Sequence, residues 1–310
     1  MSNKAWLLMV PGLLLGLGGC AAKVKEPYAV QVKKVESLAD RGDERFLQGD
    51  FVKAGRDYQR ALELSRGMDY QGGVARQLNN LGALALEEGK PAAARELFTR
   101  AYELNRDQGR LAEASTNQAN LATVAEQTGD RGEAARHLTL AEEAARASGQ
   151  KGALARIYIR WAGLALGQQD WAGAENYLNL AEPLARSTDL KAALAHQRGR
   201  LALKRGDTSA ALVAFSQALE QDRVLLDRAA MAADLYYLGE TSRLRRDWPR
   251  AFEYYSRAFD VYAALKRRAR MQECLERLRE ANREGALHQD LERFEKQILM
   301  GLTAHPHSMK

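Results

Sequence analysis

The sequence of 310 residues lacks the motifs that mark most catalytic and metal-binding sites. It has no G-x-S-x-G nucleophile elbow, no H-E-x-x-H zinc motif and no C-x-x-C pair. The Gly-Lys-Pro step at residues 89–91 lacks both the upstream glycine and the Ser or Thr of a phosphate-binding loop. His137, His196 and His288 stand singly along the chain. We therefore expect no enzymatic activity, no cofactor, no metal ion and no small-molecule substrate.

The sequence also lacks a large net excess of either positive or negative charge. The chain carries 46 basic and 40 acidic residues, and the two signs are interspersed apart from one tight basic cluster at residues 266–270. A nucleic-acid-binding face needs a continuous basic surface with stacking aromatic residues, whereas aromatic residues make up only 7% of this sequence. We therefore expect no nucleic-acid partner, and we interpret the charges as solvated helix faces.

An apolar run at residues 5–19 ends in Leu17, Gly18, Gly19 and Cys20. Its fifteen residues are too few to cross a bilayer core of about 30 Å as a helix. The small residues before Cys20 suit a processing site. The segment resembles a bacterial lipoprotein signal, which implies that Cys20 is acylated and becomes the mature N-terminus. A short uncleaved anchor or an ordinary secretory signal is the alternative.

This resemblance implies a signal peptide at residues 1–19 and a lipidated tether at residues 20–34. Ala21 stands where an inner-membrane lipoprotein has aspartate, which implies attachment to the outer membrane, facing the periplasm. With Cys20 carrying palmitate, Cys274 would be alone in the mature chain, so we expect no intramolecular disulfide. We interpret Cys274 as a small apolar residue of a helix.

The rest of the chain is dominated by a pattern of small and large residues that occurs six times. A turn position recurs at intervals of 40, 40, 40, 37 and 40 residues, and an alanine follows it five and twelve residues later. A large apolar residue stands nine residues after each turn, and a glycine or alanine stands seven residues before it. The turn positions are Gly49, Gly89, Gly129, Gln169, Gly206 and Arg246.

Each repeat is typical of two helices joined by a tight turn. In the second repeat Leu78 and Leu81 share one face of the first helix, and Ala94, Phe98 and Ala101 form the matching stripe of the second. The alanines let the helices approach closely while Phe98 fills the groove between them. Such a hairpin cannot bury its apolar stripe alone, so neighbouring hairpins must stack on it.

These features resemble the tetratricopeptide repeat family, whose signature includes a leucine-glycine pair, here Leu81 and Gly82, and an alanine four residues before an aromatic residue, here Ala94 and Phe98. The period of 40 exceeds the usual value of about 34. It is similar to that of the long-repeat subgroup, which includes kinesin light chains. We interpret the extra residues as longer second helices.

The resemblance implies an all-α fold, a right-handed α-solenoid of about six helix-turn-helix units at residues 35–266. The small-residue pattern decays after that point, although an amphipathic pattern continues. We therefore expect a pair of capping helices at residues 267–302 and a disordered tail at residues 303–310.

In this family the first helix of each repeat lines a concave groove that holds an extended peptide or a partner's helix. Arg156 and Arg160 lie one turn apart and could together hold a carboxylate. With Asn120 they match three of five positions of the clamp in chaperone-binding members, whereas Asn79 and Ala83 depart from it. Any of these side chains could instead be solvated or paired with a neighbour. The implied partner-binding residues are Asn79, Asn80, Asn120, Thr123, Arg156, Arg160, Gln197, Arg200, Tyr236 and Tyr237.

The sequence thus predicts a protein that binds a partner and does not catalyse a reaction. We expect a membrane-anchored scaffold or adaptor that binds an envelope protein or peptide and assists assembly of an envelope, secretion or pilus complex. A non-catalytic binding module for a cell-wall peptide or glycan is the alternative, and a cryptic enzyme is the third possibility.

Overall fold

The structure is a computed structural model that describes residues 27–303, and over that range it contains fourteen helices and no strand. The expected signal peptide, Cys20 and the residues after position 303 lie outside the described residues. The helices are α1 (Pro27–Leu47), α2 (Phe51–Gly67), α3 (Gln71–Glu87), α4 (Pro91–Asp107), α5 (Leu111–Gln127), α6 (Arg131–Ser148), α7 (Lys151–Gly167), α8 (Trp171–Ala181), α9 (Thr188–Lys204), α10 (Thr208–Leu225), α11 (Arg228–Leu244), α12 (Trp248–Ala264), α13 (Arg268–Glu284) and α14 (Glu292–Thr303).

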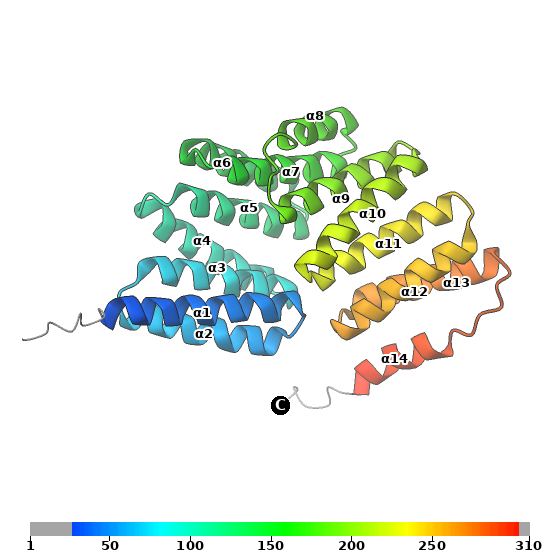
Figure 1. Ribbon diagram of the computed structural model, residues 1–310, viewed down its shortest axis with the longest axis horizontal. Helices are drawn as coiled ribbons and strands as arrows, with labels where there is room; N and C mark the ends of the chain where they lie inside the picture. The colour runs from blue at the N-terminus through cyan, green and yellow to red at the C-terminus, as the bar shows by residue number, and fades with distance from the viewer. Residues whose placement is uncertain (1–26, 304–310) are drawn as a thin grey trace, which may run out of the picture.

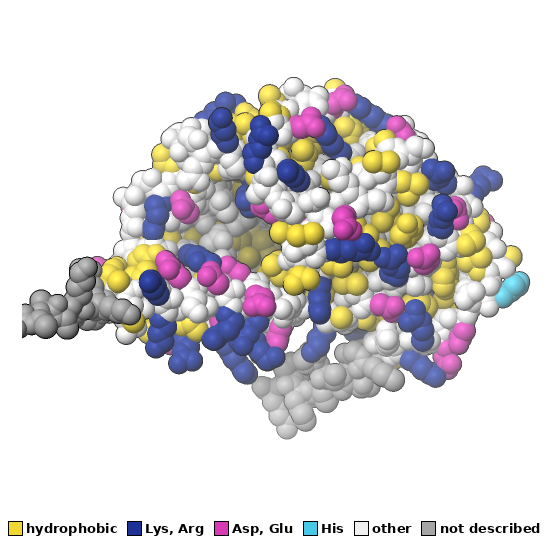
Figure 2. Space-filling view, viewed as in Figure 1, with side chains coloured by type: hydrophobic (Ala, Val, Ile, Leu, Met, Phe, Trp, Pro, Cys, Tyr) yellow, Lys and Arg dark blue, Asp and Glu magenta, His cyan; other side chains and the backbone are white. Residues whose placement is uncertain are grey.

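Consecutive helices pack as hairpins, and the hairpins stack into a curved wall that runs from α1 and α2 through α7 to α12 (Figure 1). From α1 to α11, each odd-numbered helix also contacts the next odd-numbered helix, so the first helices of the hairpins form the inner layer. The molecule is hollowed on this inner side, between α1 and α3 on one side and α9 and α11 on the other (Figure 2). The predicted all-α solenoid of about six units is therefore confirmed.

The six predicted turn positions all adopt the left-handed backbone conformation. The four glycines have φ values between 72° and 84°, and Gln169 and Arg246 have φ values of 62° and 58°. This conformation stops the first helix, and for a residue with a side chain it costs roughly 1–2 kcal/mol. The stacking of the hairpins is therefore strong enough to impose the turn even where glycine is missing.

An aspartate follows most of these turns and caps the second helix. The carboxylate of Asp50 accepts a hydrogen bond from the backbone N–H of Lys53, which satisfies one of the free donors of the first turn of α2. In the second hairpin Lys90 occupies this position, and Pro91 begins the helix instead. The capping aspartates are Asp50, Asp130, Asp170, Asp207 and Asp247.

Inside each hairpin a small residue of the first helix faces the large apolar residue of the second. A Cβ atom added to Gly82 would lie 2.7 Å from the ring of Phe98, which is closer than two carbon atoms can approach. Glycine occurs where the large residue is aromatic, and alanine where it is leucine. The six pairs are Gly42 with Tyr58, Gly82 with Phe98, Ala122 with Leu138, Ala162 with Leu178, Gly199 with Phe215 and Gly239 with Tyr255.

Two expectations, one about helix lengths and one about where the first helix begins, are wrong. Helices α3 and α4 both contain 17 residues, so the long period comes from equal helices and not from a longer second one. The expected tether at residues 20–34 extends too far, because α1 already begins at Pro27. The single spacing of 37 residues arises where α8 ends at Ala181, since Pro183 cannot continue a helix.

The C-terminal helices α13 and α14 pack on the last repeat of the wall. Phe294 of α14 packs against Phe259 and Phe252 of α12, with ring centroids 4.9 and 6.5 Å apart. The turn before α13 reaches back to the first repeats, where the Arg267 guanidinium lies 4.7 Å from the centre of the Phe51 ring and forms an ion pair with Glu87. The turn between α12 and α13 therefore contacts the first two hairpins, and the two ends of the wall meet.

We predict that the Gly82→Ala substitution destabilises the fold by about 1–3 kcal/mol, because the new methyl group overlaps the Phe98 ring. Urea unfolding monitored by circular dichroism measures the loss. Adding Phe98→Leu should recover part of it, since alanine faces leucine in two other hairpins. Gly132→Ala is the control, because nothing but a capping carboxylate oxygen at 3.5 Å lies near its added Cβ. Strictly additive effects of the two substitutions would contradict the pairing.

Candidate functional site

All ten residues implied as partner-binding lie on the inner helices, in pairs on α3, α5, α7, α9 and α11. None of them is fully buried: Arg156 and Arg160 are exposed, and the others are half-buried. The helical face that carries them is therefore open to a partner. Whether each residue contacts a partner stays a prediction.

Several of these side chains join neighbouring repeats. The Asn79 carbonyl oxygen accepts a hydrogen bond from the side-chain amide of Asn120, at 2.8 Å, which links α3 to α5. Asn80 donates to Asp43 of α1 at 2.8 Å. The Arg160 guanidinium donates to the Thr123 hydroxyl at 2.9 Å, which links α5 to α7. The inner face is thus a ladder of polar contacts that sets the spacing of the hairpins.

The two arginines of α7 have different partners in the structure, and whether they hold a carboxylate together stays a prediction. Arg156 pairs with Asp189 at the start of α9, at 3.2 Å, and so already has a carboxylate partner. Arg160 lies one turn further along and lines a hollow of about 710 Å³ in the middle of the inner face. Arg156 is thus tied to α9, whereas Arg160 is tied to Thr123 of α5.

Three arginines line this central hollow: Arg131, Arg160 and Arg200. No carboxylate of the part of the chain that the structure describes forms an ion pair with any of them. Glu126 also lines the hollow, and the surrounding protein raises the pKa of its carboxyl group even though Arg160 and Arg200 oppose that shift. The side-chain oxygen of Gln197 accepts a hydrogen bond from one guanidinium nitrogen of Arg200 at 2.8 Å. The hollow is therefore polar, with an excess of positive charge.

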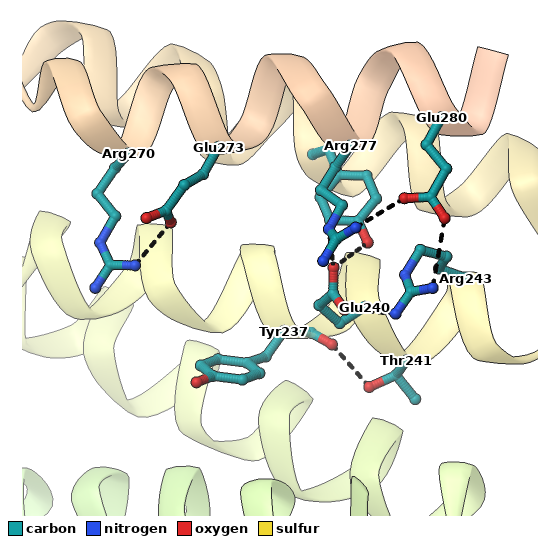
Figure 3. A network of polar contacts seen from close by, with 9 residues as sticks. Tyr237, Glu240, Thr241, Arg243, Arg270, Glu273, Arg277 and Glu280 are labelled. Atoms are coloured by element: carbon teal, nitrogen blue, oxygen red, sulfur yellow. Dashed lines mark hydrogen bonds and ion pairs between the residues drawn. The ribbon is translucent and has the colours of Figure 1, made fainter. Parts of the chain in front are cut away.

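The C-terminal end of the inner face, where Tyr236 and Tyr237 lie, is fixed by more side-chain contacts than the central hollow. The Tyr237 ring stacks on Phe215 with centroids 5.1 Å apart. Glu240 accepts a hydrogen bond from the Tyr255 hydroxyl at 2.7 Å and pairs with Arg277 of α13 at 2.8 Å, within a network of arginines and glutamates that joins α11 to α13 (Figure 3). Tyr236 lies beside this network, 5.6 Å from the Tyr255 ring. These contacts stiffen the C-terminal end and leave the central hollow as the more open region.

Two buried acidic residues, Asp222 and Asp234, lie beside His196. Asp234 is fully buried, and its carboxylate lies 2.6 Å from the imidazole Nδ1 of His196. Burial raises the pKa of Asp222 to about 8, with repulsion from Asp234 adding to the shift, and burial raises the pKa of Asp234 to about 7. Burial lowers the pKa of His196 to about 4, so the imidazole is neutral near pH 7.

Sequence reasoning missed Glu126, Arg131 and the acidic pair. Glu126 lies one turn beyond Thr123 on the same helix face, so extending that face by a turn finds it. Arg131 begins α6, the outer helix, and no facial periodicity places it in the hollow. Within residues 27–303 no helix is both long and apolar enough to cross a membrane, and no three potential metal ligands gather.

The buried acids predict a pH dependence of stability. Because their pKa values lie above the ordinary value of about 3.9, the folded chain holds protons that the unfolded chain has released, and stability falls as the pH rises toward about 8. We expect urea unfolding to show a loss of about 1 kcal/mol between pH 7 and pH 8.5, above the range in which His196 titrates. Asp222→Asn should remove most of this loss, and Asp107→Asn, at an exposed position, should not. An unchanged slope in Asp222→Asn would contradict the assignment.

Comparison with known proteins agrees with this geometry. The tetratricopeptide repeat family model matches residues 38–107. No curated protein sequence matches the chain.

Solved structures share the fold at low sequence identity. A Rap protein complexed with Competence and Sporulation Factor has a TM-score of 0.60 at 16% identity, covering 86% of this chain and 76% of its own. The apo form of RapI has a TM-score of 0.59 at 17% identity, covering 76% and 85%. The signal transduction ATPase PH0952 from Pyrococcus horikoshii, which has a tetratricopeptide repeat sensor, has a TM-score of 0.56 at 15% identity, covering 90% and 43%. Residues 38–107 are therefore tetratricopeptide repeats, and residues 27–303 have the fold of a tetratricopeptide-repeat solenoid.

Proposed function

We propose that this chain is a scaffold that holds a protein or peptide partner on its inner face. The observation that carries the proposal is the central hollow, where Arg131, Arg160 and Arg200 face solvent without an ion-pair partner among the described residues. A hollow of about 710 Å³ has the size of a specific binding pocket. The tetratricopeptide-repeat fold supports protein binding in general, and one protein of similar fold is complexed with a factor of its own.

The chemistry of the hollow favours an acidic segment. Arginine binds carboxylates through paired hydrogen bonds, and such charge-assisted contacts are worth about 1.5–3 kcal/mol each. Gln197 supplies both a donor and an acceptor, so it can hold a peptide backbone without reading the partner's sequence. We therefore propose that the partner presents one or more carboxylates to Arg160 and Arg200.

The proposed location is the cell envelope. It rests on the sequence step from Leu17 to Cys20, which lies outside the described residues. A lipid on Cys20 would attach the chain to the outer membrane on its periplasmic side, where the scaffold assists assembly of an envelope, secretion or pilus complex. A binding module for a cell-wall peptide or glycan is the second candidate, because the polar side chains of the hollow also suit such ligands.

The double substitution Arg160→Glu with Arg200→Glu is predicted to weaken partner binding by about tenfold or more. Crosslinking in living cells, followed by purification and quantification of the partner, measures the change. Arg100→Glu with Arg136→Glu is the matched control, since these arginines are exposed on the outer helices α4 and α6. Equal loss in both variants, or loss in neither, would refute the proposed site. Retention of the protein by purified cell-wall sacculi would favour the second candidate.

Replacing Cys20 by serine tests the anchor. We expect the variant to lose incorporation of labelled palmitate, because no acyl chain can attach. The Cys274→Ser chain serves as control, since Cys274 is buried in α13. Palmitate incorporation that survives the loss of Cys20 would show that the anchor assignment is wrong.

A further inference from the structure

The outer surface of the first hairpin differs from the rest of the wall in its charge. Helix α2 exposes four basic residues along its solvent face, with Glu63 as the only acidic residue among them. Basic side chains gather along this edge of the molecule (Figure 2). The basic residues are Lys53, Arg56, Arg60 and Arg66.

Three of these side chains have no ion-pair or side-chain hydrogen-bond partner among residues 27–303: Arg56, Arg60 and Arg66. Apart from Arg131 at the start of α6, arginines on the other outer helices are paired, as Arg146 of α6 is with Glu142 at 2.7 Å and Arg257 of α12 is with Glu253 at 3.3 Å. Each of those pairs is one turn apart on its own helix. Helix α2 places Arg56 and Arg60 one turn apart instead, so like charges are adjacent and repel each other. An anionic partner would relieve this repulsion.

The start of α1 adds to the same hairpin. Lys33 and Lys34 are exposed, and Tyr28 and Val30 are 51% and 50% exposed. Because the two helices of a hairpin are antiparallel, the beginning of α1 lies beside the end of α2, near Arg66. Glu36 is exposed on α1 as well, but the exposed cations beside Tyr28 and Val30 suit the surface of a bilayer, where cations meet headgroups and apolar groups enter the interface.

The proposed lipid on Cys20 brings this hairpin to a membrane. Six residues separate Cys20 from Pro27, and even fully extended they span at most about 25 Å. The first hairpin therefore lies within that distance of the bilayer.

We propose that the exposed face of α2, with the start of α1, docks on an anionic phospholipid surface and so orients the solenoid on the membrane. The wall then stands on its first hairpin, and the central hollow stays open to the periplasm. The inference builds on the proposed anchor, but the patch can be measured without it.

The experiment uses the chain from residue 20 with Cys20→Ser, which lacks both the lipid and the apolar leader and keeps every described helix. Sedimentation with vesicles of phosphatidylcholine containing phosphatidylglycerol, compared with phosphatidylcholine alone, measures binding. We expect binding to the anionic vesicles only, weakening as salt is raised, because exposed charges are screened. Arg56→Gln, Arg60→Gln and Arg66→Gln together should reduce it by about tenfold or more, since each cation contributes about 1 kcal/mol.

The control carries the same loss of charge elsewhere: Arg100→Gln, Arg136→Gln and Arg257→Gln, on α4, α6 and α12. It should bind the anionic vesicles as the unsubstituted chain does. The proposal is overturned if the unsubstituted chain ignores phosphatidylglycerol, if neutral vesicles bind equally well, or if the control loses as much binding as the α2 variant. Since the assay contains no lipidated protein, failure here leaves the Cys20 anchor standing, and failure of the anchor leaves this result standing.

Discussion

The close contact between a small residue of each first helix and a large residue of each second helix is the constraint on which the rest of the structure depends. Where Gly82 faces Phe98, the ring occupies the space that a Cβ would fill, so the helices can approach only with glycine there. In the third and fourth hairpins alanine and leucine take these two places. Six hairpins built on this contact stack side by side, and a curved wall with a defined inner side follows (Figure 1).

The polar side chains of the inner side can either join neighbouring repeats or bind a partner. Asn79, Asn120 and Thr123 join adjacent repeats, and the network around Glu240 fixes the C-terminal end, so much of the polar surface is used for holding the wall together. The middle of the inner face departs from this, because the three arginines of the central hollow have no carboxylate partner among the described residues. The contact of Arg267 with Glu87 and Phe51 joins the C-terminal end of the wall to its first repeats.

The repeat, the turns and the residues of the inner face could be predicted from the sequence alone, because these features depend on contacts within one hairpin and recur at a fixed spacing. It even placed the turns at Gln169 and Arg246, where no glycine marks them. It could not place the start of α1, since a terminal helix packs on one side only and its first residues lack the pattern. Periodicity also says nothing of contacts between distant repeats, such as that of Arg267 with Glu87, or of how Arg156 and Arg160 divide between different partners.

The central claim is that the inner face of the wall is the surface that binds the partner. A photo-crosslinking amino acid placed in living cells at Gln197, which lines the hollow, and separately at Val213, which is 70% exposed on the outer helix α10, tests it most directly. The account predicts a partner adduct from position 197 and none from position 213. An adduct that forms from position 213 while position 197 gives none would contradict it.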